Sequence, residues 1–79
     1  MGAREDLAAV VARLVDHPDR VAVREIERDG VVELWIDTAP EDRGKVIGRH
    51  GRTIKALRTL LAHRDARTGE RHELDTGDD

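Results

Sequence analysis

Two glycines three residues apart, Gly48 and Gly51, interrupt a stretch that otherwise reads as helix, in the run "VIGRHGR" at residues 46–52. Glycine reaches backbone conformations that other residues avoid, so a closely spaced pair ends one helix and begins another. The residues between the glycines, Arg49 and His50, are bulky and can both carry positive charge. The fold therefore has to accommodate a tight, cationic turn between two helices.

The segments on either side of this turn both have helical signals. Upstream, Thr38 followed three residues later by Glu41 is a capping-box pattern, and Pro40 suits the first turn of a helix. This helix has to be short because the first glycine follows closely. Downstream, a longer helix is expected from about residue 52 to about residue 65. Its apolar stripe consists of Ile54, Leu57, Leu60 and Leu61.

The first part of the chain predicts another helix. Five apolar residues recur at the helical period, and they are Leu7, Val10, Val11, Leu14 and Val15. The segment "DHPD" should end this helix, because Pro18 cannot continue it.

A β-hairpin is expected next, because Asp29–Gly30 is a strong signal for a two-residue turn. The second strand alternates, with Val32, Leu34 and Ile36 on the face predicted to meet the core and Trp35 on the other face. The first strand alternates less well, because Ile26 falls on the face opposite Val21 and Val23. This break in the pattern predicts a bulge or a slip near Arg24–Glu25.

A short last strand is expected in "ERHEL", residues 70–74, with His72 and Leu74 on one face. Residues 75–79 read as an acidic, frayed tail. The resulting order is helix–strand–strand–helix–(GRHG)–helix–strand. It predicts an α+β fold in which a three-stranded sheet has its helices packed on one face. We expect a single domain over residues 1–79, with its core between about residues 5 and 75.

Composition restricts the cellular setting and the ways of holding a ligand. The 79 residues contain no cysteine, which fits a reducing compartment. No apolar run approaches the roughly 18 residues of a membrane span, and the first residues lack the apolar stretch of a signal peptide. We therefore expect a cytoplasmic protein with no membrane partner.

Trp35 is the only aromatic residue, so aromatic stacking cannot be the main way of holding a ligand. On the face opposite the predicted core it could stack a base or contact a partner protein. A structural role in the sheet is an equal alternative.

The charge distribution is more informative than the net charge of −3. Residues 43–64 contain no acid and seven basic residues, so this segment carries +7 and the other residues total −10. The seven are Arg43, Lys45, Arg49, Arg52, Lys55, Arg58 and Arg64. An uncompensated run of this length is typical of an anion-binding surface, although charged helices are often merely solvated.

A cationic turn at the start of a helix has a specific chemical use. The first turn of a helix has unsatisfied backbone N–H groups, and the helix dipole adds positive potential there. Phosphate is the natural ligand of such a site. Arg49, Arg52 and Lys55 would surround it with charge, and Lys45 lies one helical turn before the loop.

The Gly-x-x-Gly spacing is common by itself, but here it is preceded by Ile47 and flanked by "GKVIG" and "GRTIKAL". In this setting the sequence resembles a KH domain, whose I-G-x-x-G loop clamps about four nucleotides of single-stranded nucleic acid. The predicted element order is that of the prokaryotic, type II arrangement. From Leu7 to Leu74 the chain is similar to the KhpA-like family of small bacterial single-KH-domain RNA-binding proteins.

The resemblance implies roles for eight residues. Gly48, Arg49, His50 and Gly51 would hold the sugar–phosphate backbone, Lys45, Arg52 and Lys55 would flank it, and Ile47 would help to floor the groove for the bases. It also implies an RNA chaperone or post-transcriptional regulator that binds single-stranded RNA. Its partner would be a second copy, in a homodimer, or a KH-containing protein of the Jag type, in a heterodimer.

Other classes of function have weaker support. The glycines fit neither a P-loop nor a dinucleotide-binding fingerprint. The four histidines are scattered, so we expect no metal site and no cofactor. Glu41–Asp42 reads as ordinary helix-start acids, and we predict that the chain is not an enzyme. The remaining alternative is a protein–protein adaptor with a KH-like fold and little nucleic-acid binding.

Overall fold

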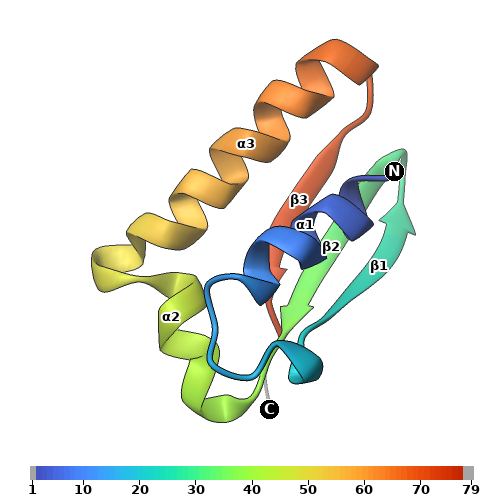
Figure 1. Ribbon diagram of the computed structural model, residues 1–79. Helices are drawn as coiled ribbons and strands as arrows, with labels where there is room; N and C mark the ends of the chain where they lie inside the picture. The colour runs from blue at the N-terminus through green and yellow to red at the C-terminus, as the bar shows by residue number, and fades with distance from the viewer. Residues whose placement is uncertain (1, 78–79) are drawn as a thin grey trace.

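The computed structural model describes residues 2–77, which form three helices and three strands joined by short turns (Figure 1). The order along the chain is α1 (Ala3–Ala12), β1 (Ala22–Arg28), β2 (Val31–Asp37), α2 (Arg43–Ile47), α3 (Arg52–Thr68) and β3 (His72–Thr76). Single 3-10 turns lie at Pro18–Arg20, Pro40–Asp42 and Arg49–Gly51. This is the element order expected from the sequence.

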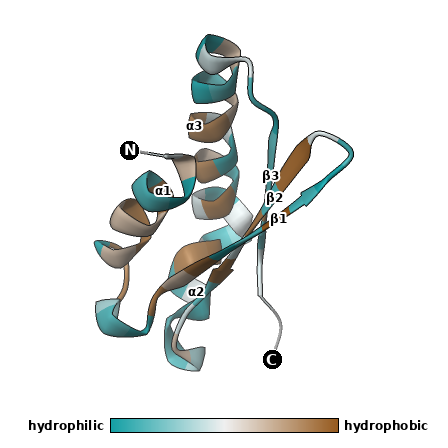
Figure 2. Ribbon diagram, turned by 90° about the vertical axis from the view of Figure 1, so that its right-hand side faces the viewer, coloured by the Kyte–Doolittle hydropathy of each residue, from teal (hydrophilic) through white to brown (hydrophobic). Residues whose placement is uncertain are grey.

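The strands form one mixed sheet in the order β1-β2-β3. The central strand β2 pairs antiparallel with β1 and parallel with β3. The chain crosses from β2 to β3 through α2 and α3, and all three helices lie on the same face of the sheet (Figure 2). The α+β class and the one-sided packing are therefore confirmed. Across residues 2–77, no helix combines the length and apolar character needed to span a bilayer.

The hairpin between β1 and β2 forms at the predicted turn. Asp29 and Gly30 both have positive φ, at 53° and 80°, which is the geometry that makes strands turn within two residues. The pairing runs without interruption from Ala22 opposite Asp37 to Arg28 opposite Val31, so the predicted bulge is wrong. Ile26 instead lies on the open face of the sheet, where its exposed fraction is 37%.

The core lies between the inner face of the sheet and the helices. It consists of Ala3, Leu7, Val11, Val23, Leu34, Ile36, Val46, Ile54, Leu57, Leu61 and Leu74. Three apolar residues predicted to face the core lie largely outside it. The apolar stripe of each helix is wider than the surface against which that helix packs. These three are Leu60, 59% exposed, and Val10 and Leu14, each 40% exposed.

The first helix is shorter than its apolar pattern suggests. It ends at Ala12, well before Pro18, and the N–H of Leu14 donates to the carbonyl of Val11 in a tighter turn. The segment that follows is held by a buried carboxylate, described below, rather than by continued helix. A tertiary contact therefore overrides the local pattern.

The last strand is paired with β2 and is also fixed to α3. Arg58 donates from Nε and Nη2 to the carbonyl of Leu74, at 3.1 and 3.0 Å. Asp65 accepts the backbone N–H of His72 at 2.8 Å. These side chains satisfy backbone groups of an edge strand, which otherwise invites unwanted pairing.

Asp75 and Thr76, expected in the frayed tail, belong to β3 and pair with β2. The Gly77 N–H extends the pairing by donating to the carbonyl of Ile36 at 2.8 Å. Residues 78–79, the rest of the predicted tail, lie outside the described residues.

Candidate nucleic-acid interface

The GRHG turn, residues 48–51, joins α2 to α3 in a compact hydrogen-bonded loop. The Gly48 N–H donates to the carbonyl of Gly44 at 2.8 Å and so closes α2. The Gly51 N–H then donates to the carbonyl of Gly48 at 3.0 Å, which closes the turn. His50 and Gly51 both have left-handed φ, at 59° and 71°. Histidine is among the non-glycine residues that tolerate this region.

The two glycines are needed for different reasons. Gly48 has a φ of 78°, and a Cβ placed on it would lie 2.8 Å from the backbone nitrogen of Thr53 and would overlap the Thr53 side chain. Gly51 also has positive φ, but a Cβ there would meet nothing within 4 Å. Gly48 thus permits a close approach of two backbone segments, whereas Gly51 only permits the turn.

The turn leads directly into the N-terminal end of α3. Gly51 is the N-cap of this 17-residue helix, and no side chain caps the helix. The Arg52 N–H donates to the carbonyl of Arg49, and no side chain accepts the N–H groups that follow it in the first turn. The helix dipole also makes this position favourable for an anion. These features place donors next to the cationic turn.

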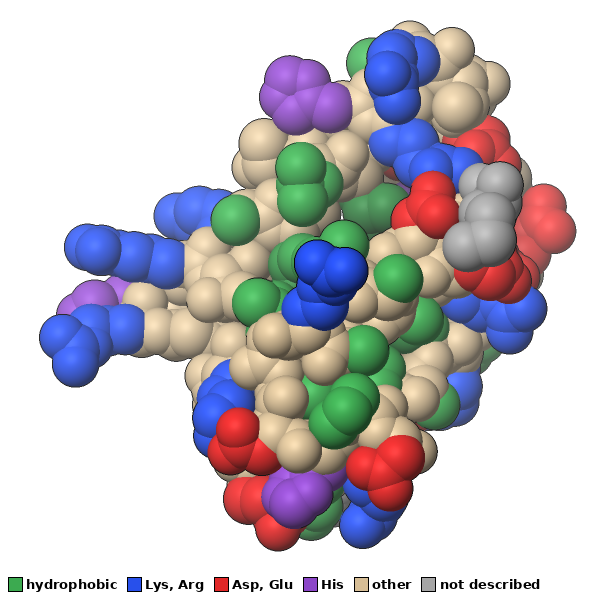
Figure 3. Space-filling model, viewed as in Figure 1, with side chains coloured by type: hydrophobic (Ala, Val, Ile, Leu, Met, Phe, Trp, Pro, Cys, Tyr) green, Lys and Arg blue, Asp and Glu red, His purple; other side chains and the backbone are tan. Residues whose placement is uncertain are grey.

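Arg49, Arg52 and Lys55 give this end of the molecule its charge. All three are exposed, and within residues 2–77 none of their side chains forms a hydrogen bond or an ion pair. Figure 3 shows basic and histidine side chains projecting on the side where the loop between α2 and α3 lies in Figure 1. The uncapped helix start and the unpaired cations therefore occupy one region.

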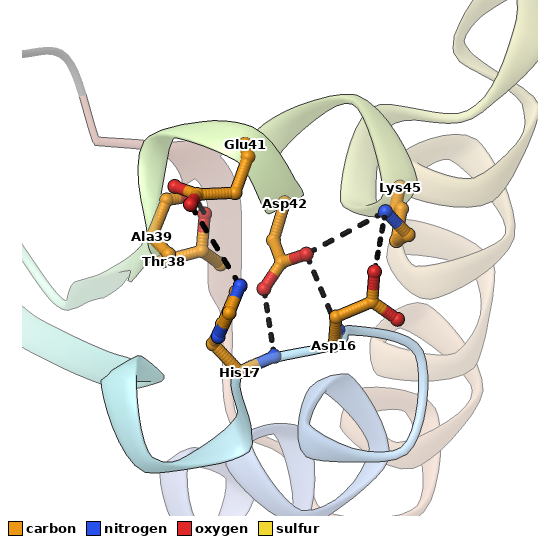
Figure 4. Close-up of polar contacts among 7 residues, drawn as sticks. All are labelled: Asp16, His17, Thr38, Ala39, Glu41, Asp42 and Lys45. Atoms are coloured by element: carbon orange, nitrogen blue, oxygen red, sulfur yellow. Dashed lines mark hydrogen bonds and ion pairs between the residues drawn. The ribbon is translucent and has the colours of Figure 1, made fainter.

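Lys45 is placed differently from these cations, although the sequence groups it with them. Its Nζ lies 3.2 Å from an Asp16 carboxylate oxygen and 3.6 Å from an Asp42 carboxylate oxygen (Figure 4). The hydrogen bond with Asp16 is the main reason that the pKa of Lys45 is raised above its ordinary value. Its charge is thus partly neutralised within the fold.

Asp42 ties the segment after α1 to the start of α2. Its side chain is fully buried and accepts the backbone N–H groups of Asp16 and His17, at 3.2 and 2.9 Å (Figure 4). Burial alone would raise its pKa, but these two N–H groups, with the positive charges of His17 and Lys45, hold the pKa below its ordinary value. Asp42 is therefore an ionised anchor beneath the helix that leads into the loop.

The predicted capping box does not form. The Thr38 hydroxyl donates to the carbonyl of Ala39 at 2.9 Å, and no side chain caps the turn that begins at Pro40. Glu41 instead lies 3.7 Å from His17 Nε2 (Figure 4). Of the two neighbouring acids, Glu41 and Asp42, Asp42 contributes more to the fold, because its hydrogen-bond partners come from a distant segment of the chain.

With this geometry established, comparison with known proteins identifies the domain. A family model described as the KH domain of KhpA/KhpB matches residues 4–75. The chain belongs to the KhpA/KhpB KH-domain family. It is 47% identical over 75 residues to a protein named RNA-binding protein KhpA from Leifsonia xyli subsp. xyli, covering 92% of this chain and 93% of that protein.

Two further relatives in the KhpA/KhpB family carry the same name. The protein from Treponema pallidum is 51% identical over 59 residues, covering 73% of this chain and 74% of the relative. The protein from Aquifex aeolicus is 40% identical over 76 residues, covering 95% of this chain and 96% of the relative. The similarity therefore extends along nearly the whole domain.

In this KhpA/KhpB KH domain the basic residues between positions 43 and 64 do not all face a common ligand surface. Arg58 is engaged with β3, and Arg64 Nη1 lies 2.5 Å from Asp6 on α1. Arg58 and Arg64 therefore support the packing of α3, as Lys45 supports α2. The basic side chains left unpaired at the loop are therefore fewer than the sequence suggests.

The apolar residues before the loop connect it to the core of the KhpA/KhpB domain. Val46 is fully buried, and Ile47 is partly buried directly before the turn. Of the eight residues that the sequence groups as an RNA site, seven lie at or beside the turn, and Lys45 is directed to other partners. The sequence does not reveal Asp42 and Arg58 as positioning residues, since nothing local distinguishes them from other charged helix residues.

One histidine-containing group has ligand atoms close enough for a metal ion. Within residues 2–77, atoms of Asp65, Glu70 and His72 lie within 4.8 Å of one another. Asp65 Oδ1 already lies 2.6 Å from His72 Nδ1, and its other oxygen accepts the His72 N–H. These contacts give the group a clear role in joining α3 to β3.

Proposed function

We propose that this KH domain binds single-stranded RNA through the GRHG turn and the first turn of α3. The proposal rests on the N-terminal end of α3, which no side chain caps and which lies beside Arg49, Arg52 and Lys55. The side chains of these three residues have no hydrogen-bond or ion-pair partner within residues 2–77. Relatives in the same family are named RNA-binding proteins. The arrangement supplies backbone donors and unpaired cationic side chains at one place.

The expected mechanism is a grip on the sugar–phosphate backbone. A phosphate accepts N–H groups from the start of α3, while Arg49 and His50 contact it from the turn. Gly48 keeps the turn close to Thr53, so the strand of RNA can approach the backbone. Ile47 lies behind the turn and offers an apolar surface to the bases, of which a KH domain holds about four.

The same features predict loose sequence preference and modest affinity. The turn contains no phenylalanine, tyrosine or tryptophan, so base stacking contributes little. Most of the binding free energy comes from phosphate contacts, and one domain should bind with a dissociation constant on the order of micromolar. An RNA chaperone or a post-transcriptional regulator fits this behaviour, because both require contact with many different RNA sequences.

The direct test replaces the two loop residues and measures binding of a fluorescent single-stranded oligoribonucleotide. Arg49→Asp with His50→Asp should weaken binding by more than about tenfold, since two repulsive charges replace two attractive ones. His63→Asp with Arg67→Asp is the matched control, because it makes the same changes on exposed positions about 16–22 Å further along α3. The control should change affinity much less.

The alternative function, a protein–protein adaptor, predicts a different outcome. Binding to the oligoribonucleotide would then be absent even at low salt, or equally weak in both double variants. Either result would contradict the proposed RNA site.

A second KH domain is the partner that we propose for this chain. Pairing would raise the avidity for RNA without adding contacts within either domain. A groove between α1 and α3 supports this, since most of its lining residues are apolar and one of them, Leu60, is 59% exposed. Leu60→Glu should lower the sedimentation coefficient of a dimer to that of a monomer. An unchanged value would place the pairing surface elsewhere.

A further inference from the structure

The face of the sheet opposite the helices is uncovered (Figure 2). Alternation along β2 places Val31, Glu33, Trp35 and Asp37 on this face. Trp35, the only aromatic residue of the chain, is partly buried there, and Ile26 of the neighbouring strand is 37% exposed. These apolar side chains lie among charged residues, in particular Glu33 and Asp37 of the same strand.

A shallow depression lies on this face between β2 and β3. The parallel register places Glu33 beside Glu73 and Trp35 beside Asp75. These four residues wall the depression, and Leu34 and Leu74 lie at its floor. Trp35 Nε1 donates to Glu33 Oε1 at 3.3 Å, which fixes the indole against one wall. We name this feature the Trp35 pocket, defined by Glu33, Trp35, Glu73 and Asp75.

The charge of the Trp35 pocket decides what kind of molecule fits it. Three of its four walls are carboxylates, and no basic residue lines it. Arg24, the nearest basic residue across β1, is held by Asp37 at 2.6 Å, and Arg28 reaches Glu33 only at 3.8 Å. The Glu73 side chain is exposed and forms no hydrogen bond or ion pair within residues 2–77.

The carboxylates of the Trp35 pocket would repel a phosphate. A cation would be attracted both by these carboxylates and by the indole ring of Trp35. A guanidinium or ammonium group can pair with the carboxylates and can also lie against the indole, which attracts cations through its π electrons. We propose that the Trp35 pocket docks an arginine or lysine side chain from a basic segment of a partner protein. The RNA site is on the helical side of the molecule, so the two ligands need not compete.

The test uses the fluorescence of Trp35, which reports on this pocket alone because the chain has no other aromatic residue. The probe is a blocked peptide of alternating glycine and arginine, seven residues long, and the reference peptide has glutamine in place of arginine. The arginine peptide should change the emission of Trp35 in a saturable manner, and the glutamine peptide should not.

Charge variants separate docking at the pocket from general attraction to an acidic protein. Glu73→Gln with Asp75→Asn should weaken peptide binding about fivefold or more, as expected for two lost ion pairs. Glu25→Gln with Glu27→Gln, exposed positions on β1, makes the same charge change and should leave the affinity nearly unaltered. All four side chains are exposed, and circular dichroism would verify that each variant is folded.

Three results would overturn the proposal. The peptide would leave the emission of Trp35 unchanged, or both double variants would weaken binding equally. In the third, a single-stranded oligoribonucleotide would change the emission and Trp35→Leu would weaken RNA binding, which would make this face an RNA surface instead.

Discussion

Gly48 and Thr53 approach each other so closely that any side chain at position 48 would overlap Thr53, with its Cβ only 2.8 Å from the Thr53 backbone nitrogen. This contact holds the turn against the first turn of α3. Because Gly48 has no side chain, the cationic turn can lie directly against the N–H groups at the start of α3. These are the two parts of the proposed phosphate site.

The first prediction compares the two glycines of the turn. Gly48→Ala should lower the free energy of unfolding by more than about 2 kcal/mol, because positive φ and overlap with backbone both oppose it. Gly51→Ala should cost only about 1 kcal/mol, since only the left-handed φ opposes it. Urea denaturation of both variants measures the difference. Equal losses would show that the approach to Thr53 is not tight.

The second prediction concerns the buried carboxylate of Asp42. Its pKa is lowered in the folded protein, so its contribution to stability is complete above the unfolded-state value of about 3.9 and is lost as the pH falls through the folded value. Asp42→Asn should lower the unfolding midpoint at pH 7 by about 5–10 °C, because one of the two N–H groups loses its acceptor.

Thermal unfolding followed between pH 2 and pH 7 provides the check on Asp42. The difference between the unmodified protein and Asp42→Asn should shrink below about pH 4, where the carboxylate begins to be protonated. Asp19→Asn, at an exposed position nearby in the chain, should show no such convergence. A difference that stayed constant with pH would mean that Asp42 does not act as an ionised anchor.

The third prediction concerns Arg58, which looks like a nucleic-acid contact in the sequence but bonds to the carbonyl of Leu74. Arg58→Leu should loosen β3 and speed hydrogen exchange of the Val32 and Gly77 amides, which bond across the β2–β3 ladder, by roughly tenfold or more. Arg67→Leu, on the same helix, is the control. Unchanged exchange together with weaker RNA binding would reassign Arg58 to the RNA surface.

The fourth prediction uses the salt dependence of RNA binding. Each phosphate contact made by a basic side chain to single-stranded nucleic acid contributes about 0.7 to the slope of log affinity against log salt. Arg52→Gln and Lys55→Gln should therefore each reduce the magnitude of that slope by about 0.7, whereas Arg67→Gln should leave it unaltered. A slope that did not respond to Arg52 or Lys55 would remove these residues from the site.

Local turn chemistry made much of the fold predictable from sequence. Asp29 and Gly30 form a turn because both residues tolerate positive φ, and no distant contact is required. Gly48 and Gly51 separate α2 from α3 for the same reason. These short-range signals also fixed the element order, and hence the α+β class and the family resemblance.

Other features were not predictable, because they depend on residues far apart in the chain. Asp42 accepts the backbone N–H of His17, 25 residues away, and so holds the segment between α1 and Pro18. Lys45 belongs to a cationic run in the sequence, yet Asp16 partly neutralises it in space. Leu60 fits the helical stripe but finds no partner in the core. The spacing of apolar residues in a sequence predicts which of them lie on the same face of a helix or strand. It does not predict which other element covers that face.

Amide NMR spectra recorded during addition of a single-stranded oligoribonucleotide test whether RNA contacts the turn and the start of α3. We expect the largest shifts on the amides of residues 48–55, with Gly51, Arg52 and Thr53 foremost. Small shifts there, with the largest on the open sheet face at residues 33–37 and 73–75, would contradict the proposed RNA site.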